Sequence, residues 1–173
     1  QGIPNSYISR FSTDNNAQWQ KHLGISLIAQ GINVTENAIN IFGEDYFSGA
    51  TLINLDADGK TNWKYHSGNK NGLEKVSLQP LSNDSKLLSF ITSSIIPMND
   101  GSFMFRSTTK INHHIIDING KATRTITQEP YIKKQNINVN NPEVVQAGII
   151  HSWSGLINEN KELVLLSDME GEE

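Results

Sequence analysis

The sequence predicts an all-β protein built from repeated antiparallel strands, and three observations support this. Tryptophan, histidine and glycine recur at the same spacing in WQKHLG, residues 19–24, and in WKYHSG, residues 63–68. Short apolar segments alternate with turns that contain Asn or Gly. Uncharged polar residues, mainly Asn, Ser and Thr, favour turns and solvent-facing strand positions over long helices, because their side chains compete for backbone hydrogen bonds.

The clearest repeat aligns residues 7–24 with residues 51–68, and a weaker copy covers residues 113–127, where Arg124 replaces tryptophan. Each copy has a strand, an Asx-Gly type of turn and a second strand. Asn and Gly tolerate the positive φ of tight turns, so DADGK and DINGK predict hairpins. The matched positions are Asp14 and Asp58, Trp19 and Trp63, His22 and His66, and Gly24 and Gly68.

A second recurring unit precedes these hairpins. Residues 35–45, 98–107 and 158–167 each contain a short polar turn with Asn and then an apolar strand, and a further short strand lies before each turn. Together the two units form a four-stranded antiparallel meander of roughly 40–45 residues, which is the size of a propeller blade.

The predicted fold is therefore all-β, with about three and a half four-stranded blades of a β-propeller that is part of a larger ring. An incomplete ring leaves strand edges exposed. The alternatives are a small closed four-bladed ring, an assembly of copies, or another β fold. The predicted boundaries are a half-blade at 7–24, a blade at 25–68, a loop, insert or extra hairpin at 69–86, a blade at 87–130 and a half-blade at 143–167.

Residues 51–68, TLINLDADGKTNWKYHSG, resemble the repeat of quinoprotein-like β-propellers of the PQQ type, which outer-membrane-assembly scaffolds share. The pattern is an apolar strand, Asp, a Gly turn, and Trp followed by a basic or aromatic residue. The resemblance implies that Trp19 and Trp63 pack between adjacent blades as docking residues. Arg124 departs from the pattern, which leaves the docking of the third blade open.

The repeated histidines and glycines also predict a structural role in blade docking. His22 and His66 share one repeat position, and Gly24 and Gly68 follow two residues later. Each histidine could bond a carbonyl of the next blade. The alternative is a ring of histidines that binds metal in a central channel.

Residues 54–62 imitate a calcium loop, because Asn54, Asp56 and Asp58 alternate before a Gly bend, as oxygen ligands of Ca²⁺ do. The twelfth position, where a bidentate Glu would complete the shell, is Tyr65. These three residues are therefore weak metal candidates, and an Asx turn cap is the alternative. We expect no cofactor.

A pair of adjacent histidines, His113 and His114, would point to opposite faces of a strand. Two ligands aimed apart make a poor metal pair. The sequence therefore predicts one surface position and one edge position.

Composition narrows the function classes. A net charge of −4 without a Lys/Arg cluster argues against binding to nucleic acid. The sequence contains no run of eighteen apolar residues, so it predicts no membrane-spanning helix. The absence of Cys excludes disulfides and thiolate metal sites. The first residue is Gln1, for which removal of a signal peptide is one explanation, so we expect a secreted or cell-envelope protein of bacterial type.

The sequence therefore favours a non-catalytic propeller module for recognition of a protein or a glycan, or for scaffolding. Its partners would be a protein or glycan, or the remaining blades of the same or another chain. The alternative is part of a propeller enzyme, a quinoprotein-type oxidoreductase or a sugar-active enzyme, with catalytic residues partly outside this chain. No catalytic residue is identifiable from the sequence.

Overall fold

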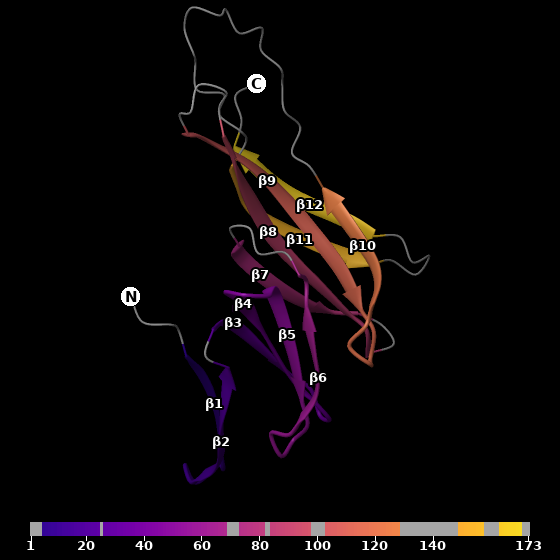
Figure 1. Cartoon of the computed structure of the whole chain (residues 1–173). Helices are drawn as coiled ribbons and strands as arrows, with labels where there is room; N and C mark the ends of the chain where they lie inside the picture. The colour runs from indigo at the N-terminus through magenta and orange to yellow at the C-terminus, as the bar shows by residue number, and fades with distance from the viewer. Residues whose placement is uncertain are drawn as a thin grey trace, which may run out of the picture.

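The computed structural model describes residues 5–24, 26–68, 73–81, 84–97, 103–128, 149–157 and 163–170. This part of the chain contains twelve β-strands (Figure 1). Their bounds are β1 (Ser6–Phe11), β2 (Ala17–Gly24), β3 (Leu27–Val34), β4 (Ile39–Asp45), β5 (Gly49–Leu55), β6 (Thr61–His66), β7 (Leu73–Pro80), β8 (Lys86–Pro97), β9 (Phe103–Ile116), β10 (Ala122–Gln128), β11 (Ile149–Ile157) and β12 (Leu163–Glu170).

The strands form four separate sheets in chain order. The hairpins β1-β2 and β11-β12 are two-stranded sheets, and β3-β4-β5-β6 and β7-β8-β9-β10 are four-stranded meanders. Every pair is antiparallel. The predicted all-β class with antiparallel strands is therefore confirmed.

Three hairpins, β1-β2, β5-β6 and β9-β10, close with the same five-residue turn. The amide of Asp56 donates to Lys60 O at 2.9 Å, and the amide of Gly59 donates to Asp56 O at 3.1 Å. Residues 12–16 and 117–121 repeat both bonds. In each turn the fourth residue has a positive φ, which Gly and Asn adopt most easily: Asn15 (62°), Gly59 (79°) and Gly120 (79°).

The same hairpins share a register shift next to the turn. It falls between Arg10 and Phe11 in β1-β2 and between Asn54 and Leu55 in β5-β6. The residue paired just beyond the shift is Trp19 in β2 and Trp63 in β6, and the corresponding residue in β10 is Arg124. The sequence repeat is therefore also a repeat of backbone geometry.

The core lies between successive sheets. All seven residues of β5 are buried, because other sheets cover both of its faces. One cluster joins β3–β6 to β7–β10, and it contains Ala50, Leu52, Val76, Leu88, Phe90 and Ile116. Another joins β1-β2 to β3–β6, and it contains Leu23, Leu27, Ile39, Ile41, Ile53 and Leu55.

The strand boundaries differ from the sequence-based ones in two segments. Within residues 69–86, where a loop, insert or extra hairpin is expected, β7 is instead the first strand of the second meander and pairs with β8. Its apolar residues Val76 and Leu78 pack into the core and alternate with Lys75, Ser77 and Gln79, so the period-2 pattern of a half-buried strand is present in the sequence. The half-blade expected at 143–167 corresponds to β11 and β12, and part of that range lies outside the described residues.

Candidate functional site

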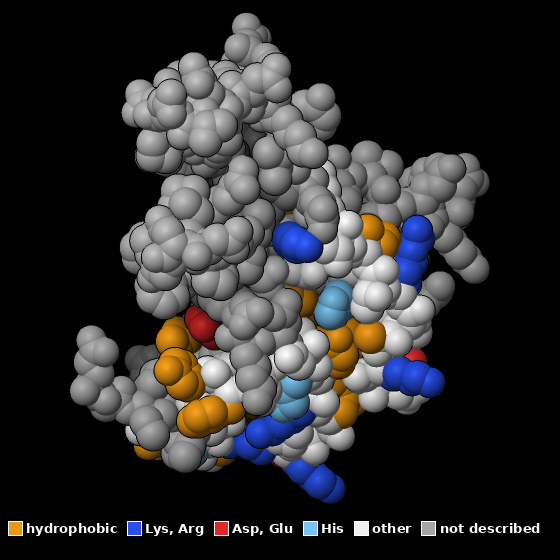
Figure 2. Space-filling view, turned by 45° about the horizontal axis from the view of Figure 1, so that its top comes forward, with side chains coloured by type: hydrophobic (Ala, Val, Ile, Leu, Met, Phe, Trp, Pro, Cys, Tyr) orange, Lys and Arg blue, Asp and Glu red, His pale blue; other side chains and the backbone are white. Residues whose placement is uncertain are grey.

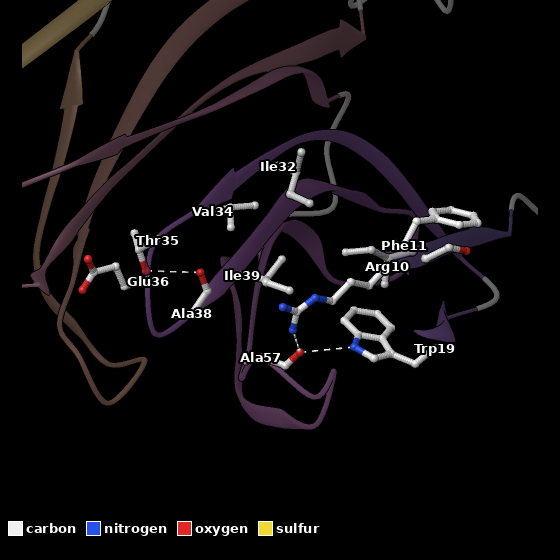
Figure 3. Close-up of a pocket in the computed structure, with 12 residues that line it drawn as sticks. Arg10, Phe11, Trp19, Ile32, Val34, Thr35, Glu36, Ala38, Ile39 and Ala57 are labelled. Atoms are coloured by element: carbon white, nitrogen blue, oxygen red, sulfur yellow. Dashed lines mark hydrogen bonds between the residues drawn. The ribbon is translucent and has the colours of Figure 1, made fainter. Parts of the chain in front are cut away.

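Two hollows flank the turn between β3 and β4. The first, which we call the apolar groove, has a volume of about 310 Å³ and lies between β1 and β3 (Figure 3). The second, which we call the polar hollow, has a volume of about 680 Å³ and lies between the two meanders. The side chains that give the groove its character are Ile8, Phe11, Trp19, Ile32, Val34 and Ile39.

The groove exists because the hairpin β1-β2 covers only part of the adjacent meander. Ile32 of β3 pairs with Ile41 of β4, and Val34 pairs with Ile39, so these four side chains share one face. Ile41 and Ile39 are buried under the hairpin, but Ile32 is 55% exposed and Val34 is 65% exposed. The outer strand of the meander therefore presents an uncovered apolar surface.

Several exposed apolar side chains line this groove. Eight large apolar side chains of the described residues are exposed, and three of them, Phe11, Ile32 and Val34, line it. Figure 2 shows apolar side chains reaching the surface of the described part, with Lys and Arg side chains scattered among them. Contiguous exposed apolar surface marks interaction sites in soluble proteins.

One wall of the groove is held by hydrogen bonds between two sheets. Arg10 Nη1 donates to Ala57 O at 2.5 Å, and Trp19 Nε1 donates to the same oxygen at 3.2 Å (Figure 3). The Trp19 ring lies against Gly59, where an added Cβ would be 3.0 Å from the ring atom Cδ2. Lys21 Nζ donates to Gly59 O at 2.6 Å. The hairpin is therefore fixed to the turn of the next sheet.

The contact between the first and second meanders repeats this arrangement. The Trp63 ring lies against Gly120, where an added Cβ would be 2.6 Å from Cδ2, and Lys86 Nζ lies 5.6 Å from the ring centroid. Each tryptophan singled out in the sequence thus contacts the glycine turn of the following sheet. Arg124, at the third position, is exposed.

The repeated histidines bond within their own hairpins, and not to a carbonyl of the next sheet. His66 Nδ1 lies 2.8 Å from Thr51 Oγ1 on the neighbouring strand. His22 Nε2 lies 3.1 Å from Asn5 Oδ1, and the His22 ring is 4.8 Å from that of Tyr7. Both histidines are exposed. Gly24 and Gly68 have positive φ values of 147° and 74°, and an added Cβ at either would meet nothing within 4 Å.

A row of asparagine amides crosses the first meander beside the polar hollow. Asn62 Nδ2 donates to Asn54 Oδ1 at 2.9 Å, and Asn54 Nδ2 donates to Asn40 Oδ1 at 2.8 Å. Asn40 Nδ2 is buried without a hydrogen-bond partner. Asn54 is therefore a member of this row, and calcium coordination would require it to leave the row.

The other two calcium candidates shape the β5-β6 turn. Asp56 Oδ1 accepts from the amides of Asp58 at 3.0 Å and Lys60 at 2.8 Å, which is the geometry of an Asx turn cap. Asp58 contributes its backbone amide to this cap. Among the residues that the structure describes, no three His, Cys, Asp or Glu side chains are grouped so that they could hold a metal ion.

His113 is buried and His114 is half-buried, so the predicted surface and edge positions are wrong. His113 is 1% exposed, and its Nδ1 lies 2.8 Å from Ser89 Oγ. His114 Nδ1 lies 2.6 Å from Tyr65 Oη of the first meander. The prediction fails because β9 is an inner strand, flanked by β8 and β10.

Burial shifts the proton equilibria of these groups. Desolvation, with a smaller repulsion from His114, lowers the pKa of His113 to about 4. Burial also lowers the pKa of His114 and raises the pKa of Tyr65. Both histidines are therefore neutral in the folded protein at neutral pH, and the buried Nε2 of His113 has no hydrogen-bond partner.

No protein-family model matches the sequence, and no curated protein matches it either. In the described part of the chain, no helix has the length and apolar character needed to cross a membrane.

Proposed function

We propose that this chain is a non-catalytic recognition and scaffold module, a propeller segment of a secreted or cell-envelope protein, and that it binds a protein partner in the apolar groove. The observation that carries this proposal is the combination of a free strand edge with an apolar floor. Phe11 lies on β1, whose one partner among the described residues is β2. Ile32 and Val34 of β3 are exposed beside it.

The propeller part of the proposal is supported by the repeated contact between sheets. The tryptophan of one sheet lies on the glycine turn of the next sheet at both Gly59 and Gly120. The core clusters also lie between consecutive sheets, as they do where blades stack side by side. A repeated junction of this kind suits a scaffold whose function resides in its surfaces.

The recognition part follows from the chemistry of a strand edge. An unpaired edge offers backbone N–H and C=O groups to an incoming extended segment, and alternate side chains of that segment then face one side. At β1 that side meets the floor formed by Ile32 and Val34. A partner segment would therefore be extended, with apolar residues at every second position.

A display library of extended peptides, selected against the protein, tests this proposal. We expect recovered peptides to carry alternating apolar residues and to bind at least tenfold more weakly to Ile32→Asp, as measured by fluorescence anisotropy. The matched control is Ile118→Asp, because Ile118 is 58% exposed and does not line the groove. Failure to recover such peptides, or equal binding to both variants, would contradict the proposal.

A further inference from the structure

We infer that the segment bound in the apolar groove is the β11-β12 hairpin of a second copy of this chain, with β12 of one copy paired to β1 of the next. This inference rests on the proposed protein-binding role of the groove. It names the partner and the strand pairing. Three structural correspondences lead to it.

The first correspondence is that β1-β2 repeats β5-β6. The two hairpins share the turn, the register shift and the pairing position of the tryptophan, where Trp19 stands opposite Arg10 and Trp63 opposite Asn54. In the complete meander, the other edge of β5 is paired with β4. The equivalent edge of β1 carries no strand among the described residues.

The second correspondence is that β11-β12 repeats β3-β4. Gly31 stands opposite Phe42 in β3-β4, and Gly155 stands opposite Leu165 in β11-β12. At Gly31 the fit is tight, because an added Cβ would lie 2.2 Å from Phe42 Cζ. An Asp follows three residues after the large apolar residue in both hairpins, and a short Asn-containing segment connects the strands in both.

The third correspondence is that the two partial sheets complement one another. Hairpin β11-β12 matches the first half of a four-stranded meander, and β1-β2 matches the second half. Within one chain the two hairpins belong to separate sheets. Pairing β12 of one copy with β1 of another would therefore complete a four-stranded sheet of the β3–β6 type.

The register of β4 and β5 specifies how the two copies would pair. Phe42 stands opposite Leu52 and Ile41 opposite Ile53. Transferred through the repeat, this register places Leu165 opposite Ile8, and Val164 opposite Ser9. Ile8 packs toward the β3–β6 meander. Because side chains alternate along a strand, Leu163 and Leu165 would lie on the same side as Ile8, over the groove.

The resulting interface is head to tail, since each copy would contribute β12 at one end and β1 at the other. Interfaces of this kind close into a ring when the rotation between copies allows it, with a ring of two as the smallest, and otherwise extend into an open chain. We therefore expect an assembled mass that rises with concentration.

Cysteine cross-linking tests the pairing directly, because the chain contains no Cys. Ser9→Cys and Val164→Cys are purified separately, mixed and mildly oxidised. We expect a covalent dimer on a non-reducing gel in at least tenfold excess over the control mixture of Thr125→Cys with Val164→Cys. Thr125 lies exposed on β10 and outside the groove. A dimer yield no greater than that of the control would overturn the inference.

Light scattering after size-exclusion chromatography provides the second measurement. The mass of the wild-type protein should rise with concentration, and Ile32→Asp, or the milder Val34→Ser if Ile32→Asp does not fold, should shift it toward the monomer. A monomeric mass at all concentrations would overturn the second-copy inference. So would an intramolecular disulfide in the double variant carrying both Ser9→Cys and Val164→Cys. If peptides from the display library still bind in the groove, the proposed function stands and only the identity of the partner fails.

Discussion

Two junctions between sheets, that of β1-β2 with β3–β6 and that of β3–β6 with β7–β10, share a tryptophan contact but differ in how much of the apolar face is covered. In both, a tryptophan lies on the glycine turn of the following sheet, Trp19 on Gly59 and Trp63 on Gly120. We call the junction between the two meanders the closed one, because β7 packs against β3 and β4 there, with the polar hollow opening beside them. The junction formed by β1-β2 leaves β3 open, and Val34 remains 65% exposed.

The difference shows that the tryptophan contact and the closure of the apolar face are separable. The tryptophan and turn position one sheet on the next, whereas the first two strands of a sheet decide whether the neighbouring apolar face is covered. The apolar groove is therefore the part of the β3–β6 face that the two-stranded hairpin β1-β2 leaves uncovered. Predictions at the tryptophans, the glycine turns and the groove test this contrast.

The largest expected effect is at the tryptophans. Trp63→Ala should lower the free energy of unfolding by about 3–5 kcal/mol, the range for truncating a packed aromatic side chain. Trp19→Ala should cost about 1–2 kcal/mol less, because its junction lacks half of the covering strands. Urea denaturation measures both values. Equal losses would mean that the open junction packs its tryptophan as well as the closed one does.

Stability should also depend on pH, through the buried His113 on the face of the second meander that points away from the first. The pKa of His113 is about 4 in the folded protein and ordinarily 6.5, so the unfolded chain binds more protons between these values. The free energy of unfolding should therefore decrease as the pH falls from 7 to 4, by about 3 kcal/mol, and His113 should contribute little further change below its folded pKa.

Denaturant titrations at a series of pH values measure this effect, with His113→Asn as the control. That variant should have a shallower slope below pH 6.5 because one titrating group has been removed. An unchanged slope would show that His113 is protonated without penalty in the folded state.

The glycine turns should respond according to how closely each ring lies. Gly120→Ala forces a left-handed residue and brings its Cβ within 2.6 Å of Trp63, so a loss of about 2–3 kcal/mol is expected. Gly59→Ala also forces a left-handed residue, but its Cβ would lie 3.0 Å from Trp19, so we expect a smaller loss of stability of about 1–2 kcal/mol. Thermal unfolding compares the two. If Gly59→Ala proves the more damaging, ring proximity does not determine the cost.

The smallest effect is expected in the groove itself. Ile32→Ala should change stability by less than about 0.5 kcal/mol, as surface substitutions usually do. The matched change is Ile41→Ala, because Ile41 stands opposite Ile32 on the same face but is 3% exposed. It should cost about 2–4 kcal/mol. A similar cost at both positions would mean that the groove is covered in solution.

Local turn chemistry made much of this fold predictable. The sequences DADGK and DINGK predict hairpins, and the turns at residues 56–60 and 117–121 lie between paired strands. The third turn, at residues 12–16, uses Asn15 in place of Gly at the positive-φ position. In each case, the backbone requirement is met by residues close together in sequence.

Features that depend on which sheet covers which strand could not be predicted. The burial of His113 depends on the position of β9 inside its sheet, and the exposure of Ile32 depends on the reach of β1-β2. The amide row required knowledge of which strands pair, since Asn40 and Asn54 are fourteen residues apart.

The amide row also constrains how the first meander can assemble. A shift of β4 against β5 by two residues would keep apolar side chains on both faces, so hydrophobic burial alone discriminates poorly against it. The same shift would separate Asn40 from Asn54 and leave their amides without hydrogen-bond partners among apolar neighbours. Each unsatisfied group would cost about 1–3 kcal/mol. The row therefore selects one register of β4 against β5 among several that hydrophobic contacts alone would allow.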